Sequence, residues 1–365
     1  MGGNAKGMKY FFRDNGTALR IVERIKALDQ PARIMHVCGT HEQIITKHGL
    51  RTLLPENIEV VAGPGCPVCI TPVKEIDEAV YLSDKNIVAT YGDMLRVPGT
   101  SISLAGKKSA GGDIRMIYSP AEAVEIAKKN PDREVIFFAI GFETTAPMTA
   151  QILLNSPPEN FSILCSHRLI PPALDFLLKE GIGIDGLIDP GHVSTIIGTH
   201  PYEELCNKYN MPQVIAGFEP IDVLMAIYML MKQIRNHEAR IENEYTRFVT
   251  YEGNTIAQEM LSKTFKADSR EWRGLGVIPQ ASLALRKEFE NFDARKKFDI
   301  PLQSDETCDQ ACFFCANVIK GAGRPKDCPN FGENCTPDKP IGACMVSTEG
   351  TCSIAYRYGT IVNQR

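Results

Sequence analysis

Cysteines are the residues of this chain with the most evident chemical potential, and they are unevenly spaced. Soft thiolates select zinc or iron–sulfur clusters, and structural zinc sites usually contain two compact Cys-x-x-Cys pairs. Only Cys312 and Cys315 form such a pair near the C-terminus, so the wide spacing there favours a [4Fe–4S] cluster over zinc or over no metal. Seven of the 12 cysteines lie in this irregular segment, at Cys308, Cys312, Cys315, Cys328, Cys335, Cys344 and Cys352.

A second group of candidate residues lies in the motif Cys38-Gly-Thr-His-Glu42. Cys38 follows an expected strand and would stand at a helix N-terminus, where the pKa of a thiol is lowered and the thiolate is favoured. His41 and Glu42 are close enough in the first helical turn to serve as ligand, base or proton relay. The alternative interpretation is a buried cysteine next to an ordinary helical His-Glu pair.

The motif Cys66-Pro-Val-Cys69 places two further cysteines close together, after a tight turn at Pro64 and Gly65. Such a pair can form a small-ring disulfide or provide two metal ligands. Because no second pair lies nearby, a redox-active dithiol is favoured over half of a structural metal site and over inert thiols. The isolated Cys165 and Cys206 are interpreted as small buried hydrophobic residues.

Further polar clusters follow other expected strands. In open α/β sheets ligands bind at the carboxyl ends of the strands, so we expect these clusters to line one cleft. Glu143 could be an acid in that cleft or lie beside a capping threonine, and His167 and His192 could be cleft residues or hydrogen-bonded core residues. The clusters are Tyr91-Gly-Asp93, Gly141-Phe-Glu-Thr-Thr145, Ser166-His-Arg168, Asp189-Pro-Gly-His192 and Gly217-Phe-Glu-Pro220.

The elements that must position these residues alternate between short β-rich runs and helical stretches, a pattern typical of βαβ units with parallel sheets. A helix at 119–131 is interpreted as a domain junction. The sequence therefore predicts an N-terminal helix (1–30), α/β domains at 31–118 and 119–235, and a helical, Cys-rich domain at 236–365. The expected strands are 33–37, 59–62, 86–90, 114–117, 134–140, 161–165, 186–188 and 213–216.

The composition limits the classes of function. The 365-residue chain has a formal net charge of -4 and no block rich in Lys and Arg, so we expect no nucleic-acid partner. No apolar run reaches the ~20 residues of a membrane-spanning helix, and the N-terminus lacks the pattern of a secretory signal. We therefore expect a cytoplasmic protein without a membrane partner, in a reducing compartment where clustered cysteines serve metal or redox chemistry.

Six motifs of this chain resemble, in order, those of the HypD family of [NiFe]-hydrogenase maturation factors. They are Cys38-Gly-Thr-His-Glu42, Gly63-Pro-Gly-Cys-Pro-Val-Cys-Ile-Thr-Pro72, Gly141-Phe-Glu-Thr-Thr145, Pro190-Gly-His-Val-Ser-Thr-Ile-Ile-Gly198, Ala216-Gly-Phe-Glu-Pro220 and Cys335-Thr-Pro with Cys344-Met-Val-Ser-Thr-Glu-Gly350. The resemblance implies two similar α/β domains and a third that carries one [4Fe–4S] cluster. It implies a redox-active assembly scaffold, rather than an enzyme with ordinary turnover, on which the Fe(CN)2CO part of the hydrogenase active site is built.

The resemblance also implies partners and residue roles. A small HypC-type chaperone would share the iron, and a HypE-type protein would donate cyanide. Cys38 would bind the iron under assembly with His41 and Glu42 beside it, and Cys66 and Cys69 would exchange electrons with the cluster. The family commonly has Cys-x-Cys-Gly where this chain has Phe-Phe-Cys-Ala at 313–316, which leaves Cys312 and Cys344 as alternative ligands. The cluster ligands that the resemblance implies are Cys315, Cys328, Cys335 and Cys352.

Two other functions fit the same residues. A free-standing [4Fe–4S]-dependent disulfide reductase needs the cluster and the Cys66/Cys69 pair, but it does not need Cys38-Gly-Thr-His-Glu42. A zinc-stabilised binding module needs neither iron nor redox chemistry, so metal analysis of the anaerobically purified protein distinguishes it from the other two.

Overall fold

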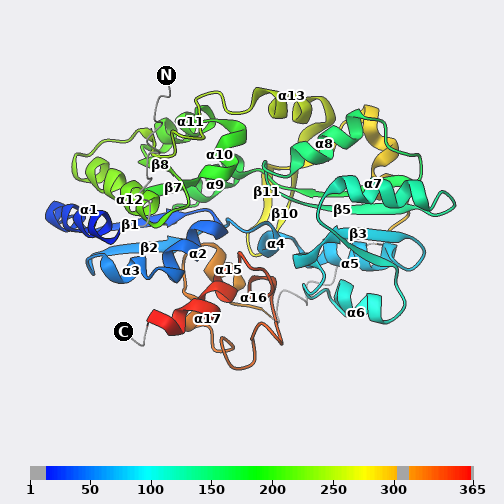
Figure 1. Cartoon of the computed structure of the whole chain (residues 1–365), viewed down its shortest axis with the longest axis horizontal. Coiled ribbons are helices and arrows are strands. Elements are labelled where there is room, and N and C mark those ends of the chain that lie inside the picture. The colour runs from blue at the N-terminus through cyan, green and yellow to red at the C-terminus, as the bar shows by residue number, and fades with distance from the viewer. Residues whose placement is uncertain (1–13, 302–311, 363–365) are drawn as a thin grey trace, which may run out of the picture.

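The computed structural model describes residues 14–301 and 312–362. Figure 1 shows two α/β lobes side by side, with short C-terminal helices below the junction between them. Each lobe contains one parallel sheet, and the described residues also contain a two-stranded antiparallel hairpin. These features confirm the predicted fold class of two similar parallel-sheet α/β domains followed by a helical and irregular C-terminal region.

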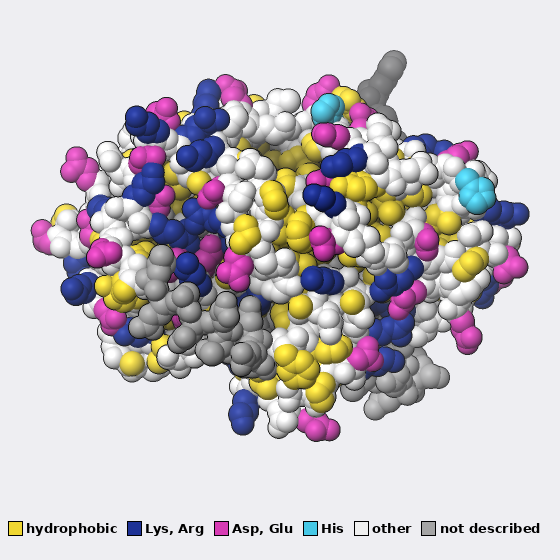
Figure 2. All heavy atoms as spheres, turned by 180° about the vertical axis from the view of Figure 1, so that it is seen from behind, with side chains coloured by type: hydrophobic (Ala, Val, Ile, Leu, Met, Phe, Trp, Pro, Cys, Tyr) yellow, Lys and Arg dark blue, Asp and Glu magenta, His cyan; other side chains and the backbone are white. Residues whose placement is uncertain are grey.

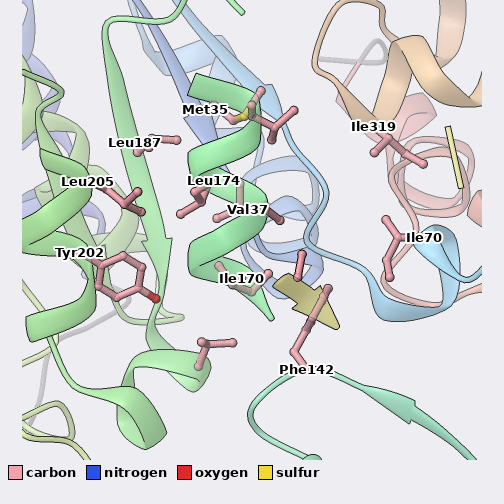
Figure 3. Packing of buried hydrophobic residues seen from close by; sticks show 14 of the residues in the cluster. Met35, Val37, Ile70, Phe142, Ile170, Leu174, Leu187, Tyr202, Leu205 and Ile319 are labelled. Atoms are coloured by element: carbon pink, nitrogen blue, oxygen red, sulfur yellow. The ribbon is translucent and has the colours of Figure 1, made fainter. Parts of the chain in front are cut away.

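The first lobe surrounds a five-stranded parallel sheet with the strand order β2-β1-β7-β8-β9. Successive strand residues point to opposite faces, so Ile34 packs with helices α1 and α12, and Met35 packs with α9 and α11. Figure 3 shows part of the Met35 face, with Leu174 and Leu205 beside Leu187 of the sheet. The strands are β1 (Ala32–His36), β2 (Ile58–Ala62), β7 (Gly186–Pro190), β8 (Gln213–Ala216) and β9 (Ile241–Asn243). The helices are α1 (Asn15–Leu28), α2 (Gly39–Lys47), α3 (Leu50–Leu53), α9 (Ile170–Lys179), α10 (Gly191–Ile197), α11 (His200–Tyr209) and α12 (Pro220–Arg235).

The second lobe surrounds a four-stranded parallel sheet with the order β4-β3-β5-β6. Its two faces are packed by different clusters, one containing Phe138 and the other Phe137. The strands are β3 (Ile87–Tyr91), β4 (Ile114–Ile117), β5 (Val135–Gly141) and β6 (Phe161–His167). The helices around this sheet are α4 (Pro67–Ile70), α5 (Val73–Leu82), η1 (Gly92–Met94), α6 (Leu104–Ser109), α7 (Pro120–Lys129) and α8 (Ala146–Leu154).

The strands predicted from the sequence are all present as β1 to β8, and β4 and β8 have the predicted bounds. Their distribution between the sheets differs from the expected division at residue 118. Residues 31–118 contribute β1 and β2 to the first sheet but β3 and β4 to the second, and β7 and β8 then return to the first. The helix expected as a junction, α7, instead connects β4 to β5 within the second lobe. Local sequence specifies strands and helices, whereas the pairing of strands depends on contacts between distant segments.

Part of the segment expected to be helical forms a hairpin of β10 (Phe265–Trp272) and β11 (Gly276–Leu285). Along β10 only Phe265 and Trp272 are buried, so the strand lacks the alternation of apolar and polar residues by which a half-buried strand is predicted. The neighbouring elements are α13 (Thr255–Thr264), η2 (Lys287–Phe292) and α14 (Ala294–Lys297).

The described C-terminal residues form short helices joined by turns, namely α15 (Cys315–Ile319), η3 (Pro325–Asp327), α16 (Ala343–Val346) and α17 (Thr351–Val362). Cys308 lies outside the described residues. No helix in the described part of the chain is long and apolar enough to cross a membrane. Figure 2 shows Lys and Arg side chains mixed with Asp and Glu over the face opposite to that of Figure 1.

Candidate functional site

The site begins at Cys38, which lies between the end of β1 and the start of α2 and is only 8% exposed. The loop before Cys66 packs directly against it. The backbone N–H of Gly39 donates to the carbonyl oxygen of Gly65 at 3.1 Å. A Cβ atom on Gly65 would lie 2.1 Å from the backbone nitrogen of Cys38, so this close approach requires glycine. The two N-terminal motifs are therefore in direct contact.

Cys66 and Cys69 form a disulfide at the start of the short helix α4, and their Cα atoms are 5.3 Å apart. The sulfur of Cys66 caps this helix by accepting a hydrogen bond from the backbone N–H of Cys69 at 3.2 Å. Both residues are buried. The geometry of this pair therefore allows the disulfide chemistry expected from the Cys-x-x-Cys spacing.

Glu42 lies in a buried hydrogen-bonded network behind Cys38. Its carboxylate accepts hydrogen bonds from Arg51 at 2.6 and 3.1 Å and from Thr46 at 2.8 Å, and it lies 2.8 Å from Nε2 of His36. Burial opposes ionisation, but the charge of Arg51 and the hydrogen bonds with His36 and Arg51 outweigh it, so the pKa of Glu42 lies well below its ordinary value. Glu42 thus holds helix α2 in place as a carboxylate.

His41 is fully buried and faces the turn after β8. Its Nε2 lies 3.0 Å from the carbonyl oxygen of Gly217 and 3.3 Å from that of Ala216. Burial lowers the pKa of His41 to about 3, so the ring is neutral and Nε2–H donates to these carbonyls. The ring of Phe218 stacks on His41 at 4.8 Å and on the exposed His192 at 3.7 Å. This stack connects the Cys38 motif to the protein surface.

The thiol of Cys38 does not have the lowered pKa expected at a helix N-terminus. Burial, followed by the nearby carboxylate of Glu349, raises its pKa to about 11. Glu349 belongs to the segment 347–350, which covers the start of α2, and Thr40 donates to its carboxylate at 3.3 Å. Asp93 holds the same segment by accepting from the hydroxyl groups of Ser347 and Thr348, each at 3.2 Å. The C-terminal region thus closes over Cys38.

Six cysteines of the C-terminal region line one pocket, together with apolar side chains that include Phe314 and Val318. The backbone N–H of Cys352 donates to the sulfur of Cys344 at 3.4 Å, and that of Ile341 donates to the sulfur of Cys335 at 3.4 Å. The cysteines are Cys312, Cys315, Cys328, Cys335, Cys344 and Cys352, which include the four predicted cluster ligands. These six cysteines, distant in the sequence, therefore share one pocket.

The chemistry of this donor set is compatible with an iron–sulfur cluster, because such clusters are held by cysteine thiolates. A pocket of cysteines with apolar walls suits such a cluster, whose potential depends on its burial and its hydrogen bonds.

Helix packing brings the disulfide, Cys38 and the pocket together. Helix α16, which carries Cys344, packs against α4, and α17, which carries Cys352 in its first turn, packs against α2. Cys66, Cys69 and Cys344 belong to one hydrophobic cluster, and Cys352 packs against it. The strand-end thiols thus lie next to the C-terminal thiols.

Comparisons with known proteins identify the family. The family model described as HypD, hydrogenase formation hypA family, matches residues 16–359. This chain belongs to the HypD family. A protein of Methanocaldococcus jannaschii named for hydrogenase expression and formation is 50% identical over 346 residues, which cover 94% of this chain and 95% of the relative. The hydrogenase maturation factors HypD of Cupriavidus necator and Azotobacter vinelandii are 44% and 43% identical and match 96% of this chain and 97% of their own lengths. The process in which this HypD chain acts is therefore hydrogenase maturation.

Not all predicted polar clusters of the HypD chain face Cys38. His167 is buried and lies 2.9 Å from the hydroxyl of Thr149, which matches the interpretation of a hydrogen-bonded core residue. Arg168 pairs with Glu75 at 2.9 Å inside the second lobe. Glu143 accepts from the backbone N–H of Ile170 at 2.9 Å, and burial raises its pKa to about 7. His167 and Arg168 thus stabilise the second lobe and Glu143 connects the two lobes, whereas the turn at 217–220 and the segment 347–350 complete the Cys38 site.

Sequence reasoning missed several residues that shape the site. His36 lies inside a strand and Arg51 in the short helix α3, and neither belongs to a motif. The sequence places Asp93 in a strand-end cluster, but its contact with the segment 347–350 depends on the fold. The sequence offered one signal for such contacts, namely that each motif follows a strand. The carboxyl ends of parallel strands lie at one edge of a sheet, where motifs can meet.

Proposed function

We propose that this chain is the scaffold on which the Fe(CN)2CO unit of [NiFe]-hydrogenase is assembled, with Cys38 as the protein ligand of the iron. One observation carries the proposal. The backbone N–H of Gly39, next to Cys38, donates to Gly65 in the loop before the Cys66–Cys69 disulfide, and both motifs pack against helices of the cysteine pocket. Membership of the HypD family supplies the process, and the adjacent thiols supply its chemistry.

In this proposal the iron unit is the cargo of the protein. Iron that accepts cyanide and carbon monoxide needs electron-rich ligands, and Cys38 would provide one thiolate while a HypC-type chaperone provides another. Because the pKa of the buried Cys38 thiol is about 11, iron binding must displace its proton. A HypE-type protein would donate the cyanide. His41 and Glu42 would position helix α2, since both are buried and hydrogen-bonded.

A cluster in the cysteine pocket would supply the electrons for this chemistry. We assign Cys315, Cys328, Cys335 and Cys352 as ligands of a [4Fe–4S] cluster, with Cys312 and Cys344 as the remaining pocket cysteines. When bound, such a cluster supplies single electrons. The Cys66–Cys69 disulfide would take up two electrons and two protons as it opens, and the dithiol would then support the reductive release of cyanide from its carrier.

Burial favours this scaffold over a free-standing disulfide reductase. A reductase must let its dithiol attack a sulfur of the partner's disulfide, which requires access. Cys66 and Cys69 are 6% and 3% exposed, so a partner disulfide cannot reach them without a rearrangement of the site. Electron exchange between this pair and a cluster inside the protein needs no such access.

The variant Cys38→Ala tests the proposal, with Cys206→Ala in α11 as the matched control for loss of a buried thiol. We expect the Cys38 variant to retain the brown absorbance of the cluster but to lose the infrared bands of iron-bound cyanide and carbon monoxide and to abolish hydrogenase maturation. The control should keep all three properties. Maturation by the Cys38 variant, or a wild-type protein that contains zinc without iron, would contradict the proposal.

A further inference from the structure

The tip of the β10–β11 hairpin lies between the disulfide helix and the cysteine pocket. The backbone N–H of Arg273 donates to the carbonyl oxygen of Ile70 at 2.8 Å, and its Nε donates to that of Thr71 at 2.9 Å. The next residue, Gly274, has a φ of +75°, and a Cβ atom there would lie 2.9 Å from Cα of Ala316 in α15. The hairpin tip therefore touches both α4 and the helix that begins at Cys315.

Apolar packing fixes the tip in this position. Trp272 is fully buried, and its indole N–H donates to the carbonyl oxygen of Ala281 at 3.3 Å. Trp272, Ile70 and Ile319 belong to one hydrophobic cluster with Cys315, and Figure 3 shows Ile70 of α4 and Ile319 of α15 on the same side of it. The hairpin cannot shift without disturbing both helices.

The guanidinium of Arg273 has donor capacity that the described residues do not use. Its side chain is buried, with the residue 5% exposed, yet Nη2 has no hydrogen-bond partner among the described residues. An unpaired buried donor is costly, so its presence calls for an acceptor. The chain neighbours of Arg273 lie next to a predicted cluster ligand, because Trp272 packs in one cluster with Cys315 and Gly274 lies against Ala316. Arg273 therefore lies beside the helix that begins at Cys315.

We propose that Arg273 is a positioning residue that holds the disulfide helix with two hydrogen bonds and directs its remaining charge and N–H donors at the sulfurs of the cluster. This inference rests on the proposed function, because it requires a cluster in the cysteine pocket. Reduction adds negative charge to a cluster, and a nearby guanidinium stabilises the reduced form. Arg273 therefore raises the reduction potential of the cluster while it keeps the electron acceptor, the Cys66–Cys69 disulfide, against the pocket.

The test is a redox titration of the reconstituted full chain, followed by the electron paramagnetic resonance signal of the reduced cluster. We expect Arg273→Met to retain the cluster and to shift its midpoint potential to a more negative value. Arg273→Lys keeps the charge and should restore most of the potential. Arg270→Met is the matched control, because Arg270 lies on the same hairpin and pairs with Asp268 at 2.8 Å.

Each outcome distinguishes the inference from the proposed function. A wild-type chain without iron and acid-labile sulfide would contradict the proposed function. A wild-type cluster whose potential is the same in Arg273→Met and Arg270→Met would overturn the role of Arg273 alone. If Arg273→Met loses its iron, the test is made with Arg273→Lys. An Arg273→Lys cluster with nearly the wild-type potential supports the inference. Loss of iron from Arg273→Lys, or a potential far below that of wild type, overturns it.

Discussion

At the residue scale, two effects of opposite sign act on the thiol of Cys38. Its position before α2 favours the thiolate, whereas burial and the carboxylate of Glu349 favour the neutral thiol. Burial is the larger effect, and the pKa rises to about 11. A protonated thiol is oxidised less readily and binds metal ions less readily than a thiolate does. It becomes a strong ligand only when a metal such as iron replaces its proton.

Removal of the Glu349 charge should therefore make Cys38 more reactive. In the metal-free, reduced protein, Glu349→Gln lowers the thiol pKa because a neutral amide replaces the carboxylate. We expect the rate of alkylation of Cys38 at pH 8 to rise roughly threefold to tenfold, since the thiolate fraction changes tenfold for each pKa unit. Peptide mass spectrometry measures this rate. Glu333→Gln, an exposed change in the same region, should leave it unchanged, and an equal or slower rate in Glu349→Gln would contradict the assigned interaction.

Glu42 gives a prediction about stability and pH. Its pKa is below the ordinary value of 4.5 in the folded protein, so its stabilising effect is complete above pH 4.5 and is lost as the pH falls below that value. Glu42→Gln should lower the free energy of unfolding at pH 7 by about 1.5–3 kcal/mol, because Arg51 and His36 lose a charged partner.

Urea unfolding at several pH values measures this difference. The gap between wild type and Glu42→Gln should be constant from pH 7 to 5 and should narrow at pH 4 and below. The exposed variant Glu125→Gln, whose residue pairs with Lys128 at 2.8 Å, should unfold almost as wild type does. A gap that widens in acid would show that Glu42 is not held as a carboxylate.

At the element scale, the contact between the end of β1 and the loop before α4 determines the geometry of the site. Gly65→Ala should place a methyl group against backbone atoms of Val37 and Cys38, which cannot move aside as a flexible side chain would. We expect it to lower the free energy of unfolding by roughly 1–3 kcal/mol and to impair maturation.

The matched control for this change is Gly359→Ala in α17, where a Cβ atom would meet nothing within 4 Å. Because alanine favours a helix over glycine, that variant should be neutral or more stable by roughly 0.5–1 kcal/mol. Thermal and urea unfolding measure both variants. A Gly65→Ala protein with wild-type stability would mean that the two motifs are not packed as described.

The elements also show how far sequence reasoning reaches. The strands that end at motifs were predictable, because apolar runs such as β5 stop at a glycine, here Gly141. The pair of Cys66 and Cys69 was also predictable, because its spacing is read directly from the local sequence. The pairing of Glu42 with His36 and Arg51 was not predictable, since these residues lie in a strand and in a short helix without a motif. The same holds for the hairpin that presents Arg273, because its first strand is buried only at Phe265 and Trp272.

At the scale of the whole molecule, each lobe contains segments from distant parts of the chain, and the C-terminal region seals the junction between them. The segment 347–350 covers Cys38 and contacts Asp93 of the second lobe, while α16 and α17 pack against α4 and α2. The lobes and the cysteine pocket therefore form one structural unit. This arrangement places Cys38, the Cys66–Cys69 pair and the cysteine pocket next to one another.

Mössbauer spectroscopy of the iron-57-labelled chain, purified anaerobically after co-expression with a HypC-type chaperone, tests the central claim most directly. We expect the signal of a [4Fe–4S] cluster together with a separate low-spin iron, and Cys38→Ala should lose only the low-spin iron. A quadruple Ala variant of Cys315, Cys328, Cys335 and Cys352 should lose the cluster signal. A low-spin iron that persists without Cys38, or iron with no cluster signal in the wild-type protein, would contradict the account.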